Sequence, residues 1–316
     1  LPVSNASMYD GASAAAEAAL LAVRQTGRRH VTVSETVDVQ TRDVLHTYLQ
    51  AMDIEVHTIP ADGVVTGRFQ PPAETAGLIV QQPNCLGYLE DMPGLAQSAH
   101  DAGALFIAVA DPLSLAVLEA PGNYGADIAV GDGQTIGNPL AFGGPSFGYM
   151  AVREELIRQL PGRLVGQTTD ADGKRAFVLT LQAREQHIRR SKAKSNICSN
   201  HQLTAIMAAI NVAALGPEGL REQAVASVAA THDLAARLSE LGLRPENGTP
   251  FFNEFLLRVS RPAAEVRAAL AAEGILAGVP VSGTFGEGLL LTATEITSAE
   301  ERQHVAEAIA RLEAQA

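Results

Sequence analysis

Lysine is the scarcest charged residue of this sequence. Only three of its 23 basic side chains are lysines, namely Lys174, Lys192 and Lys194, and residues 1–173 contain none. The two cysteines, Cys85 and Cys198, are too few for a disulfide framework or a zinc site, and this usage is typical of a reducing compartment. We therefore expect a cytoplasmic protein whose first half cannot perform any chemistry that needs a lysine amine.

Several other absences narrow the class of protein. No run of about 18 apolar residues is present, and the first residues lack the basic region and apolar core of a signal peptide, so we expect no membrane span. The net charge of −12 provides no positive field to collect phosphates, which argues against nucleic-acid binding. The eight histidines show no metal-ligand spacing, so no metal site is expected.

The apolar pattern predicts an α/β protein. Short apolar strands without polar alternation are separated by helices, which is typical of a mostly parallel sheet with helices on both faces. With 316 residues, the chain is long enough for a large domain and a smaller one. We assign residues 1–183 to a large α/β domain, 184–216 to a basic segment with a linker helix, and 217–316 to a small C-terminal α+β domain.

Individual elements follow from periodicity, capping residues and glycine stops. Residues 163–167 and 177–182 form the arms of a predicted hairpin around the turn Asp170-Ala171-Asp172-Gly173. The predicted strands are 31–34, 54–59, 77–81, 105–110, 126–130, 252–259 and 289–294, and the predicted helices are 7–26, 40–52, 92–102, 201–215, 220–241, 263–272 and 300–314.

A carboxylate follows one of the most apolar strands, 105–110. In pyridoxal phosphate enzymes of the aminotransferase fold, an aspartate at such a strand end contacts the pyridinium nitrogen, and a lysine further along forms a Schiff base. Asp111 is in place, but residues 131–137 carry Gln134 and its neighbours where the lysine is expected. Asp111 is therefore either a vestigial pyridinium contact or an ordinary strand-end or capping aspartate.

Two glycine-rich runs follow the last parallel strand. Residues 131–137 do not match a dinucleotide fingerprint, because the third glycine comes one residue late and no helix follows. In Phe142-Gly143-Gly144-Pro145, paired glycines permit a close backbone approach, as at a site or a subunit contact. A structural turn explains the second run equally well.

A basic segment stands out from this acidic sequence. It favours an interface or an anion-facing surface, although a solvated charge run is the usual explanation. Cys198 has cations nearby that favour a thiolate, yet a small buried side chain explains it more simply. The candidate interface or docking residues are Arg184, His187, Arg189, Arg190, Lys192 and Asn196.

These motifs together resemble one family, subunit 1 (the α subunit) of glycine dehydrogenase (decarboxylating), the P-protein of the glycine cleavage system. The resemblance spans nearly the whole sequence. We expect this sequence to lack the long N-terminal segment of that family. The motifs that carry it are Asn5-Ala6-Ser7-Met8-Tyr9-Asp10-Gly11-Ala12, Gln81-Gln82-Pro83-Asn84-Cys85-Leu86-Gly87, Ala110-Asp111-Pro112-Leu113, residues 125–134, Phe142-Gly143-Gly144-Pro145 and Arg184-Glu185-Gln186-His187-Ile188-Arg189-Arg190.

The resemblance implies a pyridoxal phosphate-dependent transferase fold of type I and a heterotetramer of α and β subunits. It implies that pyridoxal phosphate and its Schiff-base lysine belong to the partner, glycine dehydrogenase subunit 2 (β). Gln134, or a residue beside it, then stands where β carries the lysine. The complex decarboxylates glycine and passes the aminomethyl group to the lipoyl arm of H-protein, so this chain by itself is expected to be inactive, with no catalytic or cofactor-binding residue.

Two alternatives remain from the sequence. The chain could be an independent pyridoxal phosphate enzyme that uses Lys192 or Lys194, although both follow the large domain instead of lying within it. It could also be a degenerate, non-enzymatic interaction protein of the same fold.

Overall fold

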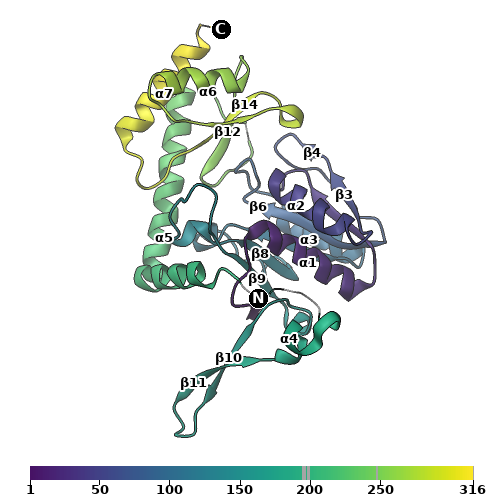
Figure 1. The fold of residues 1–316 in the computed structure, drawn as a ribbon. Coiled ribbons are helices and arrows are strands. Elements are labelled where there is room, and N and C mark those ends of the chain that lie inside the picture. Colours follow the sequence, from purple (N-terminus) through teal and green to yellow (C-terminus); the bar gives the residue numbers. More distant parts are fainter. Residues whose placement is uncertain (194–196, 198–199, 247, 316) are drawn as a thin grey trace. The chain divides into compact units, whose positions relative to one another are not determined.

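The computed structural model describes all residues except 194–196, 198–199, 247 and 316, and the chain forms two compact units (Figure 1). The first unit contains Leu1–Pro60, Thr66–Gln82 and Asp91–Gly216. The second contains Ala61–Val65, Pro83–Glu90 and Pro217–Ala316. The domain limits inferred from sequence stay a prediction, although residue 217 begins both the expected small domain and the main part of the second unit.

The first unit is built on a seven-stranded sheet with the strand order β1-β9-β8-β7-β6-β2-β3. The neighbours from β8 to β3 pair in parallel, whereas β9 pairs antiparallel with both β8 and β1. The strands are β1 (Val3–Ser4), β2 (His30–Ser34), β3 (Glu55–Ile59), β6 (Thr75–Gln82), β7 (Leu105–Ala110), β8 (Ile128–Asp132) and β9 (Gly148–Val152).

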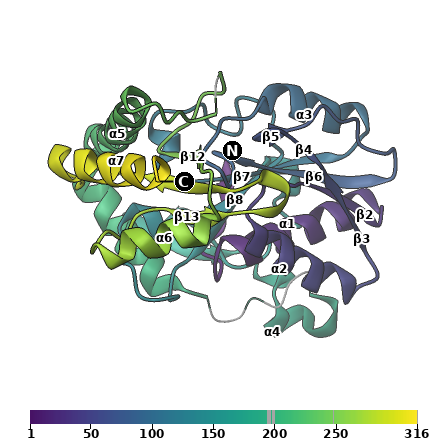
Figure 2. The ribbon, with the colours of Figure 1, turned by 90° about the horizontal axis from the view of Figure 1, so that it is seen from above.

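Helices cover both faces of this sheet, with α1 (Gly11–Thr26) and α2 (Val39–Gln50) on one side and α3 (Met92–Asp101) on the other (Figure 2). Successive side chains of one strand point to opposite faces. Accordingly, Ile79 packs in the core with α1, while Leu78 and Val80 pack in the core with α3. Burial on both faces explains why the strands show no polar alternation.

The alanine-rich sequence of α1 lets it lie close to the sheet. Asp10 caps its N-terminus in a capping box with Ser13, and Gly27 ends it in the left-handed conformation. A Cβ added at Gly77 would come within 3.0 Å of the Ala22 methyl group, so the helix and β6 are in direct contact. This packing fixes the N-terminus of α1 next to the end of β8.

The rest of the first unit consists of short elements and a hairpin, which extends away from the sheet (Figure 1). The carboxylate of Asp170 accepts hydrogen bonds from the backbone N–H groups of Asp172 and Lys174 and so stabilises the predicted turn. The elements are η1 (Ser114–Ala116), η2 (Gln134–Ile136), η3 (Glu154–Leu156), β10 (Leu164–Thr169), β11 (Arg175–Thr180), η4 (Gln182–Arg184), α4 (Gln186–Arg189) and η5 (Arg190–Lys192).

The second unit combines an antiparallel sheet, in the order β12-β14-β13, with helices. In its core, Leu238, Phe255 and Leu289 pack with apolar residues of the last two helices, 263–272 and 299–313. The elements are β12 (Glu254–Arg258), α6 (Ala263–Ala272), β13 (Val279–Val281), η6 (Gly283–Phe285), β14 (Gly288–Thr292) and α7 (Ala299–Glu313). The short paired strands β4 (Ala61–Asp62) and β5 (Val65–Thr66) also belong to this unit, except for Thr66.

The helix α5 (Gln202–Glu240) is interrupted at Gly216, whose φ of 67° and ψ of 179° are not helical, and Pro217 follows. It therefore consists of two helices, 202–215 and 217–240, close to the two that the sequence predicts. By length and composition alone, α5 qualifies as a candidate membrane span, which the sequence analysis did not expect. The break at Gly216 makes this weak evidence.

The sequence prediction missed strands β1, β4, β5, β9 and β13, and β8 lies two residues later than expected. Residues 148–152 alternate between buried and half-buried side chains, as an antiparallel strand does. They follow the glycine-rich run Phe142-Gly143-Gly144-Pro145, for which the sequence analysis predicted no strand. The sheet is therefore mixed near its β1 edge.

Candidate functional site

Asp111 lies where the sequence places it, at the carboxyl end of β7. Its carboxylate accepts hydrogen bonds from the backbone N–H of Leu113 at 3.1 Å and from the Thr135 hydroxyl at 2.6 Å. Burial raises the pKa of this carboxyl above its usual value, while these hydrogen bonds oppose the rise. Thr135, and not Gln134, is the η2 residue that bonds to Asp111.

A cavity of about 390 Å³ opens in front of Asp111. Four carboxylates line it, from Asp10, Asp38, Asp111 and Asp132, and no Lys or Arg is among its lining residues. The amide groups at the N-terminus of α1 are also engaged: Gly11 donates to Asp132 at 3.1 Å, and Ser13 donates to Asp10 at 2.7 Å. Carboxylates thus stand where a helix N-terminus could bind a phosphate.

These residues do not fit pyridoxal phosphate. The cofactor needs a lysine amine for covalent attachment and a neutral or positive setting for its phosphate. Residues 1–173, which include every residue lining the cavity, contain no lysine, and the four carboxylates would repel a phosphate. Among the residues that line the cavity, Asp111 alone matches the expected constellation.

Asp132, at the end of β8, joins several separate segments. Besides the Gly11 amide, its carboxylate accepts hydrogen bonds from the Gln134 N–H at 2.9 Å and from the Ser146 hydroxyl. A Cβ at Gly11 would lie 2.8 Å from the Asp132 nitrogen, and one at Gly148 would overlap the Asp10 carbonyl. Gly11 and Gly148 are therefore needed for close backbone contact. At the paired Gly143 and Gly144, where the sequence allowed a close approach, an added Cβ would meet nothing within 4 Å.

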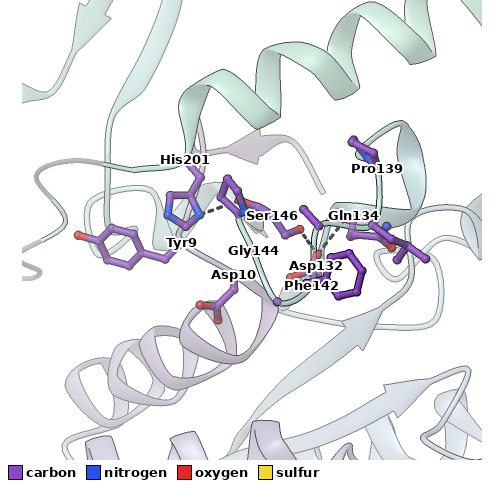
Figure 3. A pocket seen from close by; sticks show the side chains of 13 residues that line it. Tyr9, Asp10, Asp132, Gln134, Pro139, Phe142, Gly144, Ser146 and His201 are labelled. Atoms are coloured by element: carbon purple, nitrogen blue, oxygen red, sulfur yellow. Dashed lines mark hydrogen bonds between the residues drawn. The ribbon is translucent and has the colours of Figure 1, made fainter.

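Gln134 does not line the cavity at Asp111 but contributes to a pocket at the glycine-rich loop. Its side-chain amide donates to the Asn138 carbonyl at 2.9 Å, and it lines a larger pocket of about 740 Å³ (Figure 3). The pocket is bounded by Tyr9, Asp10, Asp132, His201 and residues 139–146. The sequence analysis singled out this loop but did not assign a role to His201.

His201 holds the loop in place from the start of α5. Its ring lies 5.8 Å from the Tyr9 ring in an edge-to-face contact, and its Nδ1 is 2.6 Å from the Ser146 carbonyl oxygen, to which it donates. Thr204 donates to the same oxygen at 3.0 Å. The loop, the N-terminus of α1 and the first turn of α5 therefore form one connected structure (Figure 3).

The basic segment is not uniform. Arg184 donates to the backbone carbonyls of Leu160 and Gly162, and burial lowers the pKa of its guanidinium, so it braces the base of the hairpin. His187 and Arg190, with Arg163, line a separate cavity of about 590 Å³. Arg189 and Lys192 are exposed.

The remaining predicted positions are less informative. Asn196, Lys194 and Cys198 lie outside the described residues. No hydrogen bond or ion pair between described residues joins the basic segment to Asp111 or Gln134. In the part of the chain that the structure describes, no group of three His, Cys, Asp or Glu side chains could hold a metal ion.

Comparison with known proteins places this geometry in a family. Residues 1–309 match the family model of the glycine cleavage system P-protein. The chain is 49% identical over 312 residues to "Probable glycine dehydrogenase (decarboxylating) subunit 1" of Moorella thermoacetica. This alignment covers 95% of this chain and 70% of that protein. It is 45% identical over 308 residues to the protein of the same description in Geobacillus kaustophilus, with 95% and 69% covered.

Solved structures agree. The crystal structure of a glycine decarboxylase (P-protein) of the glycine cleavage system superimposes with a TM-score of 0.95 at 52% identity, covering 99% of this chain and 72% of that one. A sphingosine-1-phosphate lyase of Burkholderia pseudomallei superimposes with a TM-score of 0.68 at 16% identity, over 96% of this chain and 69% of its own, and shows the fold alone. The predicted type I fold is confirmed, and the chain belongs to the glycine cleavage system P-protein family.

Proposed function

We propose that this chain is the cofactor-free subunit of a glycine decarboxylase and that it works only together with a second, catalytic subunit. The observation that carries this proposal is the cavity at Asp111. It retains the strand-end aspartate of the fold, but four carboxylates line it and two of them occupy the N-terminus of α1. A chain with this site can support glycine decarboxylation as part of a complex but cannot hold the cofactor itself.

The second subunit, glycine dehydrogenase subunit 2, then carries pyridoxal phosphate and the lysine to which it is attached. Two relatives described as subunit 1 share 45–49% of their aligned residues with this chain, which supports a partner of this kind. The assembled enzyme removes CO2 from glycine and transfers the aminomethyl group to the lipoyl arm of H-protein. The location of this complex in the cytoplasm stays a prediction from the cysteine content.

The exposed part of the basic segment is our candidate surface for H-protein. The chain has a net charge of −12, yet Arg189, Arg190 and Lys192 form a cluster of cations at the base of the hairpin. Among the described residues, no ion pair neutralises them. Arg184 is excluded from the surface because it braces the hairpin. A positive patch of this kind speeds association with an acidic partner.

Charge reversal tests this surface. Arg189→Glu combined with Arg190→Glu should weaken H-protein binding several-fold at low salt, and the difference should shrink as salt is added. Arg267→Glu in α6, an equally exposed arginine, is the matched control and should leave binding unchanged. If the double variant binds H-protein like the unmodified chain, H-protein does not dock on this segment.

The proposed function itself is tested by glycine–CO2 exchange in the presence of H-protein and the second subunit. Exchange should require both subunits and should be absent with either one alone. Equal exchange by the second subunit with and without this chain would overturn the proposal and would favour a non-enzymatic interaction protein. Exchange by this chain without the second subunit would instead favour an independent enzyme.

A further inference from the structure

Two long segments of the first unit contain no charged residue. They are residues 133–152 and 195–216, in a protein of which 18% of residues are charged. The first includes the glycine-rich loop, and the described part of the second includes the helix 202–215. Such depletion of charge is typical of the centre of a protein interface.

The two segments pack against each other. The side-chain amide of Asn138 donates to the Thr204 carbonyl at 3.4 Å, and the Ser146 carbonyl accepts from both His201 and Thr204. A Cβ at Gly137 would come within 2.5 Å of Asn211. The loop and the helix therefore present a single surface, which we call the uncharged face.

The helix 202–215 presents its large apolar side chains to solvent. Its buried positions include the small residues Thr204 and Ala208, whereas four of its five exposed large apolar residues, all but Leu215, recur at spacings of three and four, as on one face of a helix. The loop adds two more, and the exposed fractions of all six run from 38% to 109%. These residues are Leu203, Ile206, Met207, Ile210, Leu140 and Phe142.

Phe142 is the most exposed of these residues. Its φ of 51° lies in the left-handed region, which strains a bulky non-glycine residue. Strained backbone of this kind concentrates where a side chain has a function. Phe142 also borders the 740 Å³ pocket, so the face has both a protruding aromatic side chain and a hollow beside it.

We propose that the second subunit of the decarboxylase covers the uncharged face, and that a side chain of that subunit enters the pocket beside Phe142, which Asp10 and Asp132 also line. This inference rests on the proposed function. Six exposed apolar side chains and the pocket supply on the order of half of the ~800 Å² that each partner buries in a standard interface. Outside the pocket, where Asp10 and Asp132 lie, this surface carries no charge and resembles a protein core cut in two, as in permanent complexes.

A lipid surface suits this face less well. One side of the helix 202–215 is packed on the loop through Thr204 and Asn211, and the helix ends at Gly216. Only the stripe formed by its large apolar residues is available. A second copy of this chain would also find an apolar surface, and it is therefore an outcome of the experiment.

The experiment measures binding of the second subunit to the 316-residue chain by size-exclusion chromatography with light scattering and by titration calorimetry. The variants are Phe142→Asp and Ile210→Glu, each of which adds one charge to the uncharged face. Because both side chains are exposed, and because aspartate tolerates a positive φ better than phenylalanine, the fold should persist, as circular dichroism would show. Leu276→Asp and Ile296→Glu, at residues 95% and 86% exposed in the second unit, are the matched controls.

We expect each face variant to weaken binding at least tenfold and each control to change it less than twofold. If the unmodified chain binds the second subunit and both face variants bind equally well, this inference is wrong while the proposed function stands. If the unmodified chain does not bind the second subunit at all, the proposed function fails as well. Self-association, or binding to phosphatidylcholine vesicles, that only the face variants abolish would assign the face to a different occupant.

Discussion

The carboxylate of Asp132 offers the sharpest test of how the site is held together. It accepts hydrogen bonds from the Gly11 and Gln134 amides, at 3.1 and 2.9 Å, and from the Ser146 hydroxyl. In Asp132→Ala the buried Gly11 amide loses its partner, which costs about 1–3 kcal/mol. Loss of a negative charge at the N-terminus of α1 costs about 0.3–1 kcal/mol more.

We therefore expect Asp132→Ala to lower the free energy of unfolding by about 1.3–4 kcal/mol. Asp132→Asn retains an acceptor and should cost about half as much, and Glu222→Ala, at an exposed position of α5, should have almost no effect. Urea unfolding followed by circular dichroism measures all three. A loss below about 0.5 kcal/mol in Asp132→Ala would refute the view that this carboxylate supports the N-terminus of α1.

Three further predictions concern the strands beside the cavity. Because burial raises the pKa of Asp111, this carboxyl holds its proton more tightly in the folded state than in the unfolded state, and its contribution to stability falls as pH rises above the usual aspartate pKa. Asp111→Asn should therefore gain stability relative to the unmodified chain between acidic and neutral pH, as urea unfolding at several pH values would show. Tyr149→Phe removes the 2.8 Å hydrogen bond to the Ala110 carbonyl and should lower the unfolding free energy by about 0.5–1.5 kcal/mol in the same assay. In Gly131→Ala the new methyl group would overlap the Ala110 carbonyl, so thermal unfolding should show a loss of about 1–3 kcal/mol or more, and an unchanged melting temperature would contradict the close contact of β7 and β8.

Much of the fold could be predicted from sequence because its elements are built from continuous apolar runs. The strand 105–110 and the helix 263–272 lie within the predicted limits, since both are flanked by strong stop signals. Strand β9 was missed because its alternating, half-buried residues follow a glycine-rich run that reads as a loop. Its antiparallel pairing depends on β8 and β1, which lie far from it in the sequence.

The site was predictable in chemistry more than in geometry. The absence of lysine could be counted directly, and Asp111 was placed from the end of a strand. Asp111 is contacted by Thr135 and not by Gln134, and this depends on the backbone conformation of the short helix 134–136. The carboxylates at the N-terminus of α1 come from separate segments, so no local pattern reveals that they meet.

The helix 202–215 shows why the orientation of an apolar face is hard to predict. Its period of three and four residues indicates a helix, and the usual expectation is that the large apolar side chains point inward. The structure buries the small side and exposes the large one. A sequence records which residues share a face, but it does not record whether that face is covered by the same chain or by another.

The central claim, that the cofactor belongs to the partner, is tested most directly by trapping it. The two subunits are combined with pyridoxal phosphate, reduced with borohydride and digested, and the modified lysine is identified by mass spectrometry. The account predicts a phosphopyridoxyl group on a lysine of the second subunit and none on this chain. A stoichiometric phosphopyridoxyl group on Lys192 or Lys194 would contradict it and would make this chain an enzyme in its own right.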